Sequence, residues 1–271
     1  MPINKKRIEE SYDLQAENFK GAKQIAYLLI RDLQIPKNSV CLDIGCGDGL
    51  TTAALYEHCQ KEGIIYGLDI SQRMIDKAII NCRKLGYEDI CFLKGDAESL
   101  NFPANMFDVV VSLYTFQFIP DKWKCLKEMY RVLKPGGYMC LFFPASEMFQ
   151  KETFEIFRTV TQRHVEFTEL NHILSEFGEM HITLEEFQDM LHDIGFTSLD
   201  FMGRHRVIYE KNTKNYLETN PYPFDLLLSI PDEYREKVKT NVIDKMLKLS
   251  DKRGFKLTFY NIMGHAQKPN I

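Results

Sequence analysis

A glycine-rich turn is the strongest chemical feature of the sequence. Residues 42–49 read Leu-Asp-Ile-Gly-Cys-Gly-Asp-Gly, between an apolar run and a segment with helical spacing. At the carboxyl end of a parallel strand, such a turn lets a ligand touch the backbone. The spacing departs from the dinucleotide fingerprint Gly-x-Gly-x-x-Gly, because Leu50 or Thr52 stands where the third glycine would be. A dinucleotide is therefore not the expected ligand.

Acidic side chains flank this turn and indicate a cationic ligand. Asp43 precedes the glycines and Asp48 lies among them, so a pyrophosphate would meet like charges there. S-adenosyl-L-methionine has no phosphate and carries a sulfonium and an ammonium group, which suit these carboxylates. Asp69 ends the next apolar run, 20 residues after Gly49, near the spacing at which an acidic side chain accepts ribose hydroxyls. The structural alternatives are a plain tight turn and a helix N-cap at Asp69.

Two later loops extend the candidate site. The first comprises residues 95–98. In it, Asp96 can bond an adenine amino group, while a backbone N–H of the loop, which includes Ala97, bonds a ring nitrogen. The alternative is a plain polar loop without a ligand. The second, 112–118, reads Ser-Leu-Tyr-Thr-Phe-Gln-Phe and lies nearest the reacting methyl group if the cofactor binds as expected. Met74 fits either a cover for the adenine or a core position of its helix.

Alternating strand and helix signals must position these loops. Apolar runs that end in the candidate loops predict strands at 40–44, 64–70, 90–93, 107–113 and 138–143. Helical spacing lies between them at 50–59, 74–85 and 123–133. Further on, we expect an irregular helix at 148–177 and then a helix that is capped by Thr183 and Glu186 and ends at Gly195. Strands are expected at 196–209 and 255–266, with a helical insertion at 212–253 between them. The pattern predicts a parallel sheet covered on both faces.

As a set, these motifs resemble those of class I S-adenosylmethionine-dependent methyltransferases. The resemblance rests on five segments in register: Asp43–Gly49, Asp69, Gly95–Glu98, Phe107–Phe118 and Arg131–Gly137. It implies a Rossmann-like, doubly wound α/β fold with a mostly parallel seven-stranded sheet, helices on both faces and a helical lid. It also implies one domain, 1–271, with an N-terminal helical lid segment at 1–35 and helical insertions at 146–182 and 210–253 that form a substrate cap.

Within that class, the chain resembles the group of juvenile hormone acid, trans-aconitate and malonyl-acyl-carrier-protein methyltransferases. Cys46–Gly49 with Tyr114-Thr115 is similar to the first, and Phe116–Asp121 is similar to the second. These relatives methylate carboxylates. Phe118 departs from them, since they usually carry a tryptophan whose N–H could hold a carboxylate, and phenylalanine cannot donate.

The resemblance and the loops together define the candidate residues. The expected cofactor contacts are Tyr12, Asp43, Gly45, Cys46, Gly47, Asp69, Ile70, Met74, Asp96, Ala97, Leu113 and Phe118. The expected catalytic residues are Tyr114, Gln117 and Gln15, of which the first two are neutral hydrogen-bonding groups that can orient an oxygen nucleophile. A carboxylate nucleophile needs no base. We therefore expect O-methylation of a small or hydrophobic acid, with N- or C-methylation of another small metabolite, or a non-catalytic cofactor-binding scaffold, as alternatives.

Composition limits the partners of the chain. The net charge is −4 and no long basic run occurs, which disfavours nucleic-acid binding. The seven cysteines include no Cys-x-x-Cys pair, which favours free thiols over disulfides or a metal site. No apolar run approaches the roughly 20 residues that span a bilayer. The expectation is a cytoplasmic enzyme without a metal, a monomer or weak homodimer, whose partner is a small-molecule substrate.

Overall fold

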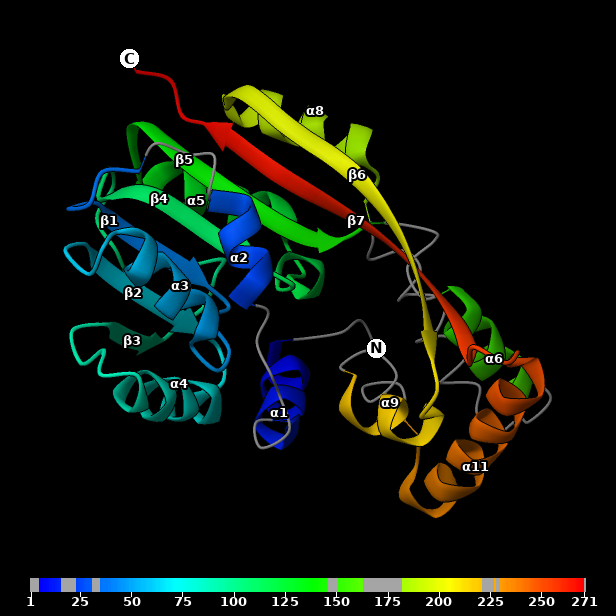
Figure 1. The fold of residues 1–271 in the computed structure, drawn as a ribbon. Helices are drawn as coiled ribbons and strands as arrows, with labels where there is room; N and C mark the ends of the chain where they lie inside the picture. Colours follow the sequence, from blue (N-terminus) through cyan, green and yellow to red (C-terminus); the bar gives the residue numbers. More distant parts are fainter. Residues whose placement is uncertain are drawn as a thin grey trace.

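A single twisted sheet organises the chain. The computed structural model describes residues 5–15, 23–30, 35–145, 151–162, 182–220, 227 and 230–270. Within them, seven strands lie in the order β3-β2-β1-β4-β5-β7-β6, and all neighbours are parallel except those of β7 (Figure 1). The strands are β1 Val40–Ile44, β2 Ile64–Asp69, β3 Cys91–Lys94, β4 Phe107–Leu113, β5 Leu133–Pro144, β6 Thr197–Glu210 and β7 Phe255–Gln267. The predicted seven-stranded Rossmann-like sheet is confirmed.

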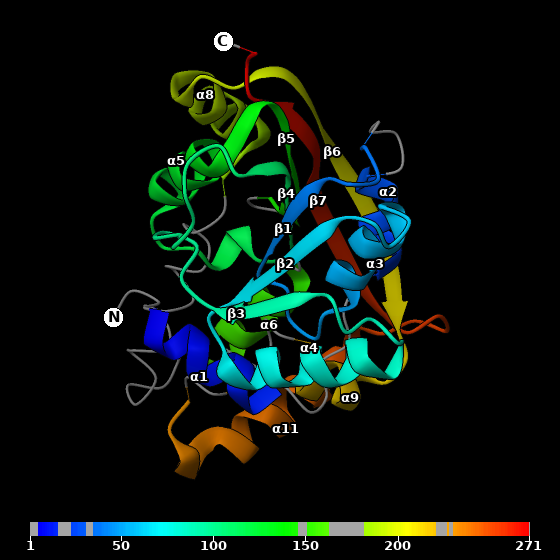
Figure 2. The same ribbon diagram turned by 90° about the vertical axis from the view of Figure 1, so that its left-hand side faces the viewer.

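Helices cover both faces of this sheet because their apolar stripes pack against its buried side chains. Figure 2 shows α5 and α8 on one face and α2 and α3 on the other. The helices are α1 Lys5–Gln15, α2 Lys23–Ile30, α3 Leu50–His58, α4 Gln72–Lys84, α5 Lys122–Val132, α6 Lys151–Thr161, α8 Leu184–Ile194, α9 Thr213–Thr219 and α11 Asp232–Leu249, with a 3-10 turn η1 at Phe116–Phe118. The capping box of Thr183 and Glu186 and the end of α8 at Gly195 are confirmed.

The last two strands run past the rest of the sheet into a separate cluster of helices. Beyond the end of β5, the described residues of β6 and β7 form strand pairs with each other, and the two strands reach α6, α9 and α11 (Figure 1). We call these three helices with the outer ends of β6 and β7 the outer lobe. Its buried core includes Phe157, Leu217, Val242 and Leu257, and Phe118 of the sheet domain joins the same core. The outer lobe is thus packed beside the carboxyl edge of the sheet.

Some boundaries differ from the sequence prediction. β5 begins at Leu133 rather than 138, because Leu133 pairs with Phe107 through an irregularity in the ladder. Of the predicted helix at 148–177 the structure describes α6, and the remainder falls outside the described residues, as does most of the insertion at 146–182. All seven cysteines are free; six are buried and Cys91 is exposed. Among the described helices, none has the length and apolar character required to cross a bilayer.

Candidate functional site

The glycine turn is held against the neighbouring strand by its own backbone. The N–H groups of Gly45 and Cys46 both donate to the Leu68 carbonyl, at 2.7 and 3.0 Å. Gly45 has a φ of +72°, and a Cβ built on it would lie 2.0 Å from Oγ1 of Thr115. Only glycine fits this position without strain, because both the backbone region and the space exclude a side chain. The turn therefore lies at the carboxyl edge between β1 and β4, the switch point of the sheet.

Asp69 ties the turn to the start of α4. Its carboxylate is buried and accepts hydrogen bonds from the N–H groups of Gly47 and Ser71, both at 2.9 Å. The N-cap of α4 is Ser71, whose Oγ accepts from the Met74 N–H at 3.1 Å, so the capping alternative for Asp69 is not what the structure shows. A carboxylate offers further lone pairs beyond these two bonds. Asp69 can thus both shape the turn and accept a hydroxyl.

Asp43 is the most completely buried acid of the turn. It is 1% exposed, and one oxygen accepts from the Thr52 hydroxyl at 2.7 Å. The other, Oδ1, has no hydrogen-bond partner among the described residues. Burial raises the pKa of Asp43 to about 7, and the nearby charges of Asp69 and Asp48 act in the same direction. A buried, unpaired acceptor within an acidic cluster fits the cationic S-adenosylmethionine and disfavours a pyrophosphate.

The loop after β3, residues 95–98, contacts α1. Asp96 accepts from the Glu98 N–H at 2.9 Å, and Nζ of Lys5 lies 2.6 Å from the carboxylates of both Asp96 and Glu98. The lysine therefore occupies one oxygen of the predicted adenine acceptor. Ala97 is half-buried against the core under α5.

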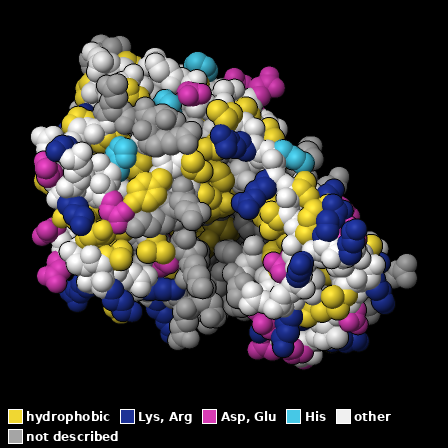
Figure 3. Space-filling view, viewed as in Figure 1, with side chains coloured by type: hydrophobic (Ala, Val, Ile, Leu, Met, Phe, Trp, Pro, Cys, Tyr) yellow, Lys and Arg dark blue, Asp and Glu magenta, His cyan; other side chains and the backbone are white. Residues whose placement is uncertain are grey.

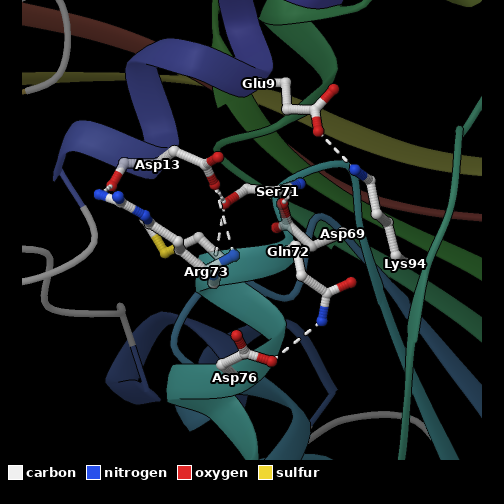
Figure 4. A network of polar contacts seen from close by, with 9 residues as sticks. Glu9, Asp13, Asp69, Ser71, Gln72, Arg73, Asp76 and Lys94 are labelled. Carbon is white, nitrogen blue, oxygen red and sulfur yellow. Dashed lines mark hydrogen bonds and ion pairs between the residues drawn. The ribbon is translucent and has the colours of Figure 1, made fainter.

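One face of α1 holds a row of charged groups spaced by four residues. Lys5 binds Asp96 and Glu98 in the loop after β3. Glu9 pairs with Lys94 at the end of β3, and Asp13 accepts from the Ser71 hydroxyl (Figure 4). Arg73 also donates to the Asp13 carbonyl at 3.2 Å. Residues at i, i+4 and i+8 share a helix face, which is why one helix can contact both the end of β3 with its following loop and the start of α4. This polar face lays α1 across the carboxyl ends of β2 and β3.

The adjoining face of α1 is apolar. The Tyr12 ring meets the Phe118 ring edge-on at 5.5 Å, and Ile8 and Ile70 belong to the same cluster. Three predicted cofactor contacts, Tyr12, Ile70 and Phe118, are thereby brought together. The side chain of Gln15 lies outside the described residues.

Tyr114 and Gln117 form a hydrogen-bonded unit after β4. Tyr114 has a φ of +55°, rare for a side chain of this size, and its N–H donates to the Phe142 carbonyl at 2.7 Å. Nε2 of Gln117 donates to the Tyr114 carbonyl at 2.7 Å, while Oε1 is buried without a partner among the described residues. That contact also settles the amide orientation, since the opposite one would place two oxygens together. A buried acceptor is left at the expected reaction site.

The remaining predicted contacts are buried beside the turn, namely Cys46, Met74 and Leu113. Met74 is fully buried on the inner face of α4, where the sequence left both an adenine contact and a core role open. Sequence reasoning missed Thr52, Ser71, Thr115 and Lys5, which support Asp43, Asp69, Gly45 and Asp96. Lys5 and Thr115 act on residues 91 and 70 positions away, and their types alone carry no signal of these contacts. Thr52 and Ser71 lie nine and two positions from the aspartates to which they donate.

The acidic cluster predicts opposite pH trends for stability and ligand affinity. Burial raises the pKa of Asp43 to about 7 and that of Asp69 to about 6. The folded chain then holds protons more tightly than the unfolded chain, whose aspartates titrate near 3.9, so stability should fall as pH rises from about 4 to about 7. Affinity for S-adenosylmethionine should rise over the same pH window, because a cation favours the ionised carboxylates.

Thermal unfolding and calorimetry at several pH values test these two trends, with Asp43→Asn as the variant expected to flatten both. Affinity independent of pH would contradict it.

Comparisons with known proteins agree with this geometry. A family model described as a methyltransferase domain matches residues 42–141. The chain is 29% identical over 206 residues to demethylmenaquinone methyltransferase of Anoxybacillus flavithermus, covering 71% of this chain and 85% of that protein. It is 31% identical over 175 residues to the ubiquinone/menaquinone biosynthesis C-methyltransferase UbiE of Haemophilus ducreyi, covering 62% and 68%.

The fold and the lengths can be compared as well. A phosphoethanolamine N-methyltransferase of Haemonchus contortus, solved with S-adenosylhomocysteine, superposes with a TM-score of 0.59 at 20% identity, covering 96% of this chain and 56% of that one. This similarity shows a shared fold. The chain spans about half the length of three other relatives named demethylmenaquinone methyltransferase.

Proposed function

Because this chain belongs to the class I S-adenosylmethionine-dependent methyltransferases, we propose that it methylates a ring carbon of a hydroxylated aromatic small molecule of the quinol type. The observation that carries the proposal is the unpaired Oε1 of Gln117. A buried acceptor without a donor costs free energy, which a ligand hydroxyl would recover. A phenol or quinol has such a donor, and an ionised carboxylate has none.

The surroundings of Gln117 suit an apolar ring. Phe118, Tyr12 and Ile70 are apolar or aromatic neighbours at the same edge of the sheet. Figure 3 shows a hollow with hydrophobic side chains on its walls between the sheet domain and the outer lobe. Of the two relatives compared above, one is named as a demethylmenaquinone methyltransferase and the other as a C-methyltransferase of ubiquinone and menaquinone biosynthesis. We take α1 as a lid over the cofactor and the outer lobe as a cap over the substrate.

The cofactor supplies a methyl group already activated by its sulfonium, so the protein mainly positions and desolvates the reactants. In this proposal Asp43, Asp69 and the turn at Gly45 hold the cofactor. Gln117 accepts a hydrogen bond from a substrate hydroxyl and so orients the ring, whose carbon beside a hydroxyl is made nucleophilic by electron donation from the hydroxyl oxygen. That ring carbon forms a bond to the methyl carbon as the bond from sulfur to methyl breaks, and it then loses its own proton to solvent, which restores the aromatic ring. The sequence-based expectation of carboxylate O-methylation stays as a second candidate, favoured by the absence of Asp, Glu, His and Lys from residues 114–118.

A deuterated quinol distinguishes the two reactions. The substrate is a 2-prenyl-1,4-naphthohydroquinone with deuterium at ring carbon 3, incubated with S-adenosylmethionine and kept reduced. Carbon methylation should release the deuterium and give a product stable to base, whereas a methyl ester would be hydrolysed. Methylation of carboxylic acids with no turnover of this quinol would reject the proposal.

Gln117→Ala tests the carrying observation. It should lower kcat/KM for the quinol by an amount that corresponds to a rise of about 1–3 kcal/mol in the activation free energy, the range for one buried hydrogen bond. The affinity for S-adenosylhomocysteine should stay unchanged. Gln162→Ala, an exposed glutamine on the outer lobe, is the matched control. An unchanged kcat/KM in Gln117→Ala would show that the substrate hydroxyl lies elsewhere.

A further inference from the structure

The outer part of the β6–β7 ladder carries two arginines on one face. Arg204 lies opposite Asn261, and Arg206 lies opposite Phe259. Directly opposed residues of an antiparallel pair share a face, and residues two apart on one strand do so too. We call this part of the ladder, residues 204–210 paired with 255–261, the β6–β7 arm. One face of the arm therefore carries Arg204, Arg206, Phe259 and Asn261.

That face is the one on which Tyr114 packs. Asn261 lies opposite Pro144, the last residue of β5, and two residues earlier Phe142 lies opposite Met263. The Tyr114 ring contacts the Phe142 ring at 4.7 Å between centroids. Burial raises the pKa of Tyr114 to about 12, while the positive charge of Arg206 acts on it in the opposite direction. The arm thus brings positive charge to the residue that begins the candidate reaction site.

The polar groups of this face lack partners of their own. Asn261 is 5% exposed, and its Oδ1 is buried without a hydrogen-bond partner among the described residues. Neither Arg204 nor Arg206 has an ion pair with any described residue, whereas Arg253, at the tip of the arm, pairs with Asp251 at 2.6 Å. Charges on an edge strand can protect it from aggregation, but that role does not require a buried unpaired amide between them and β5.

We propose that Arg204 and Arg206 form an anion-binding subsite that holds an acidic oxygen of the substrate beside Tyr114, and that Oδ1 of Asn261 accepts a hydrogen bond from a hydroxyl of the same substrate. Guanidinium groups bind carboxylate and phenolate oxygens strongly, whereas an amide oxygen only accepts, so Oδ1 of Asn261 suits a hydroxyl donor and the arginines suit the anion. The inference rests on the proposed function in taking this edge as the substrate site. It adds a substrate class: an aromatic acid, bound either through a carboxylate or through an ionised ring hydroxyl.

Binding assays on the full chain saturated with S-adenosylhomocysteine test the subsite. Calorimetry compares 2-naphthoate with 2-naphthamide, which is similar in shape and uncharged. The wild type should bind the carboxylate at least about tenfold more tightly, the size of one charge-assisted hydrogen bond, and Arg204→Gln/Arg206→Gln should remove the difference. Arg253→Gln, the control, should keep it. For the ring-hydroxyl source, 2-naphthol replaces the acid, and its absorbance should show ionisation at a lower pH when bound to the wild type than in the double variant.

A preference for the carboxylate supports a subsite that binds a carboxylate oxygen. A shifted ionisation of naphthol supports a subsite that binds an ionised ring hydroxyl. The subsite is rejected if the wild type binds neither probe, or if neither effect depends on the two arginines. Unchanged affinity for S-adenosylhomocysteine and an unchanged unfolding temperature exclude misfolding of the double variant. No methyl transfer is measured, so the subsite can hold while the deuterated quinol is not methylated, and the two proposals fail independently.

Discussion

Replacing Gly45 by alanine should destabilise the protein and reduce cofactor affinity by about two orders of magnitude. The backbone there has a φ of +72°, and the new Cβ would lie 2.0 Å from Oγ1 and 2.4 Å from Cγ2 of Thr115. Left-handed backbone costs an L-residue about 1–2 kcal/mol, and an overlap in a packed site adds about 1–3 kcal/mol. Relief of the overlap must move either the turn or Thr115, and both adjoin the expected cofactor site.

Gly86→Ala is a matched control for this experiment. Gly86 has a φ of +74°, and nothing lies within 4 Å of a Cβ built there. It should therefore lose only the backbone contribution and keep full affinity for S-adenosylhomocysteine. Chemical denaturation and calorimetry on both variants separate the two causes. Equal destabilisation and equal affinities would mean that the contact with Thr115 has no role in shaping the turn.

The parts of this fold that the sequence predicts are those with local causes. The capping box links Thr183 to Glu186, three residues away, and the apolar run at 107–113 forms β4 with the predicted bounds. The glycine turn is predicted for the same reason, since its residue types respond to the backbone they must adopt. Element types and their order follow from such signals, and with them the parallel sheet.

The features that were missed depend on contacts between distant residues. Lys5 reaches Asp96 across 91 positions, and the row of Lys5, Glu9 and Asp13 has no meaning until α1 lies over β2 and β3. The early start of β5 depends on pairing with Phe107. A charged residue in a sequence is usually solvated, and only the tertiary structure shows which charges meet.

The role proposed for Gln117 depends on a contact that the sequence alone does not indicate. The sequence indicates a neutral group able to orient an oxygen nucleophile, and the structure leaves its Oε1 unpaired. The direction of the amide depends on the Tyr114 carbonyl. The position of this carbonyl follows from the left-handed backbone of Tyr114, which no sequence pattern predicts. In the proposed function, that direction favours a substrate with a hydroxyl donor over an ionised acid.

Asp69→Ala should weaken binding of S-adenosylmethionine by about 3 kcal/mol or more, over a hundredfold. The carboxylate accepts from the N–H groups of Gly47 and Ser71, and hydrogen bonds to a charged group contribute about 1.5–3 kcal/mol each. Removing it leaves two buried donors unpaired and removes the expected ribose acceptor. Asp69→Asn should lose nearly as much, because an amide can accept only one of the two N–H groups and turns its own NH₂ toward the other.

Asp76→Ala, on α4 and seven residues after Asp69, provides the matched control. Asp76 is exposed, and among the described residues its carboxylate accepts a hydrogen bond from Gln72 at 2.9 Å. Cofactor affinity should therefore stay unchanged in Asp76→Ala. Calorimetry with S-adenosylmethionine and S-adenosylhomocysteine adds a charge test, since the two differ by the positive sulfonium. If Asp69 acts through its charge as well as its shape, Asp69→Asn should weaken the sulfonium ligand more than the neutral thioether. Equal losses for both ligands would show that Asp69 acts by holding the turn, and an unchanged affinity in a folded Asp69→Ala variant would place the ribose elsewhere.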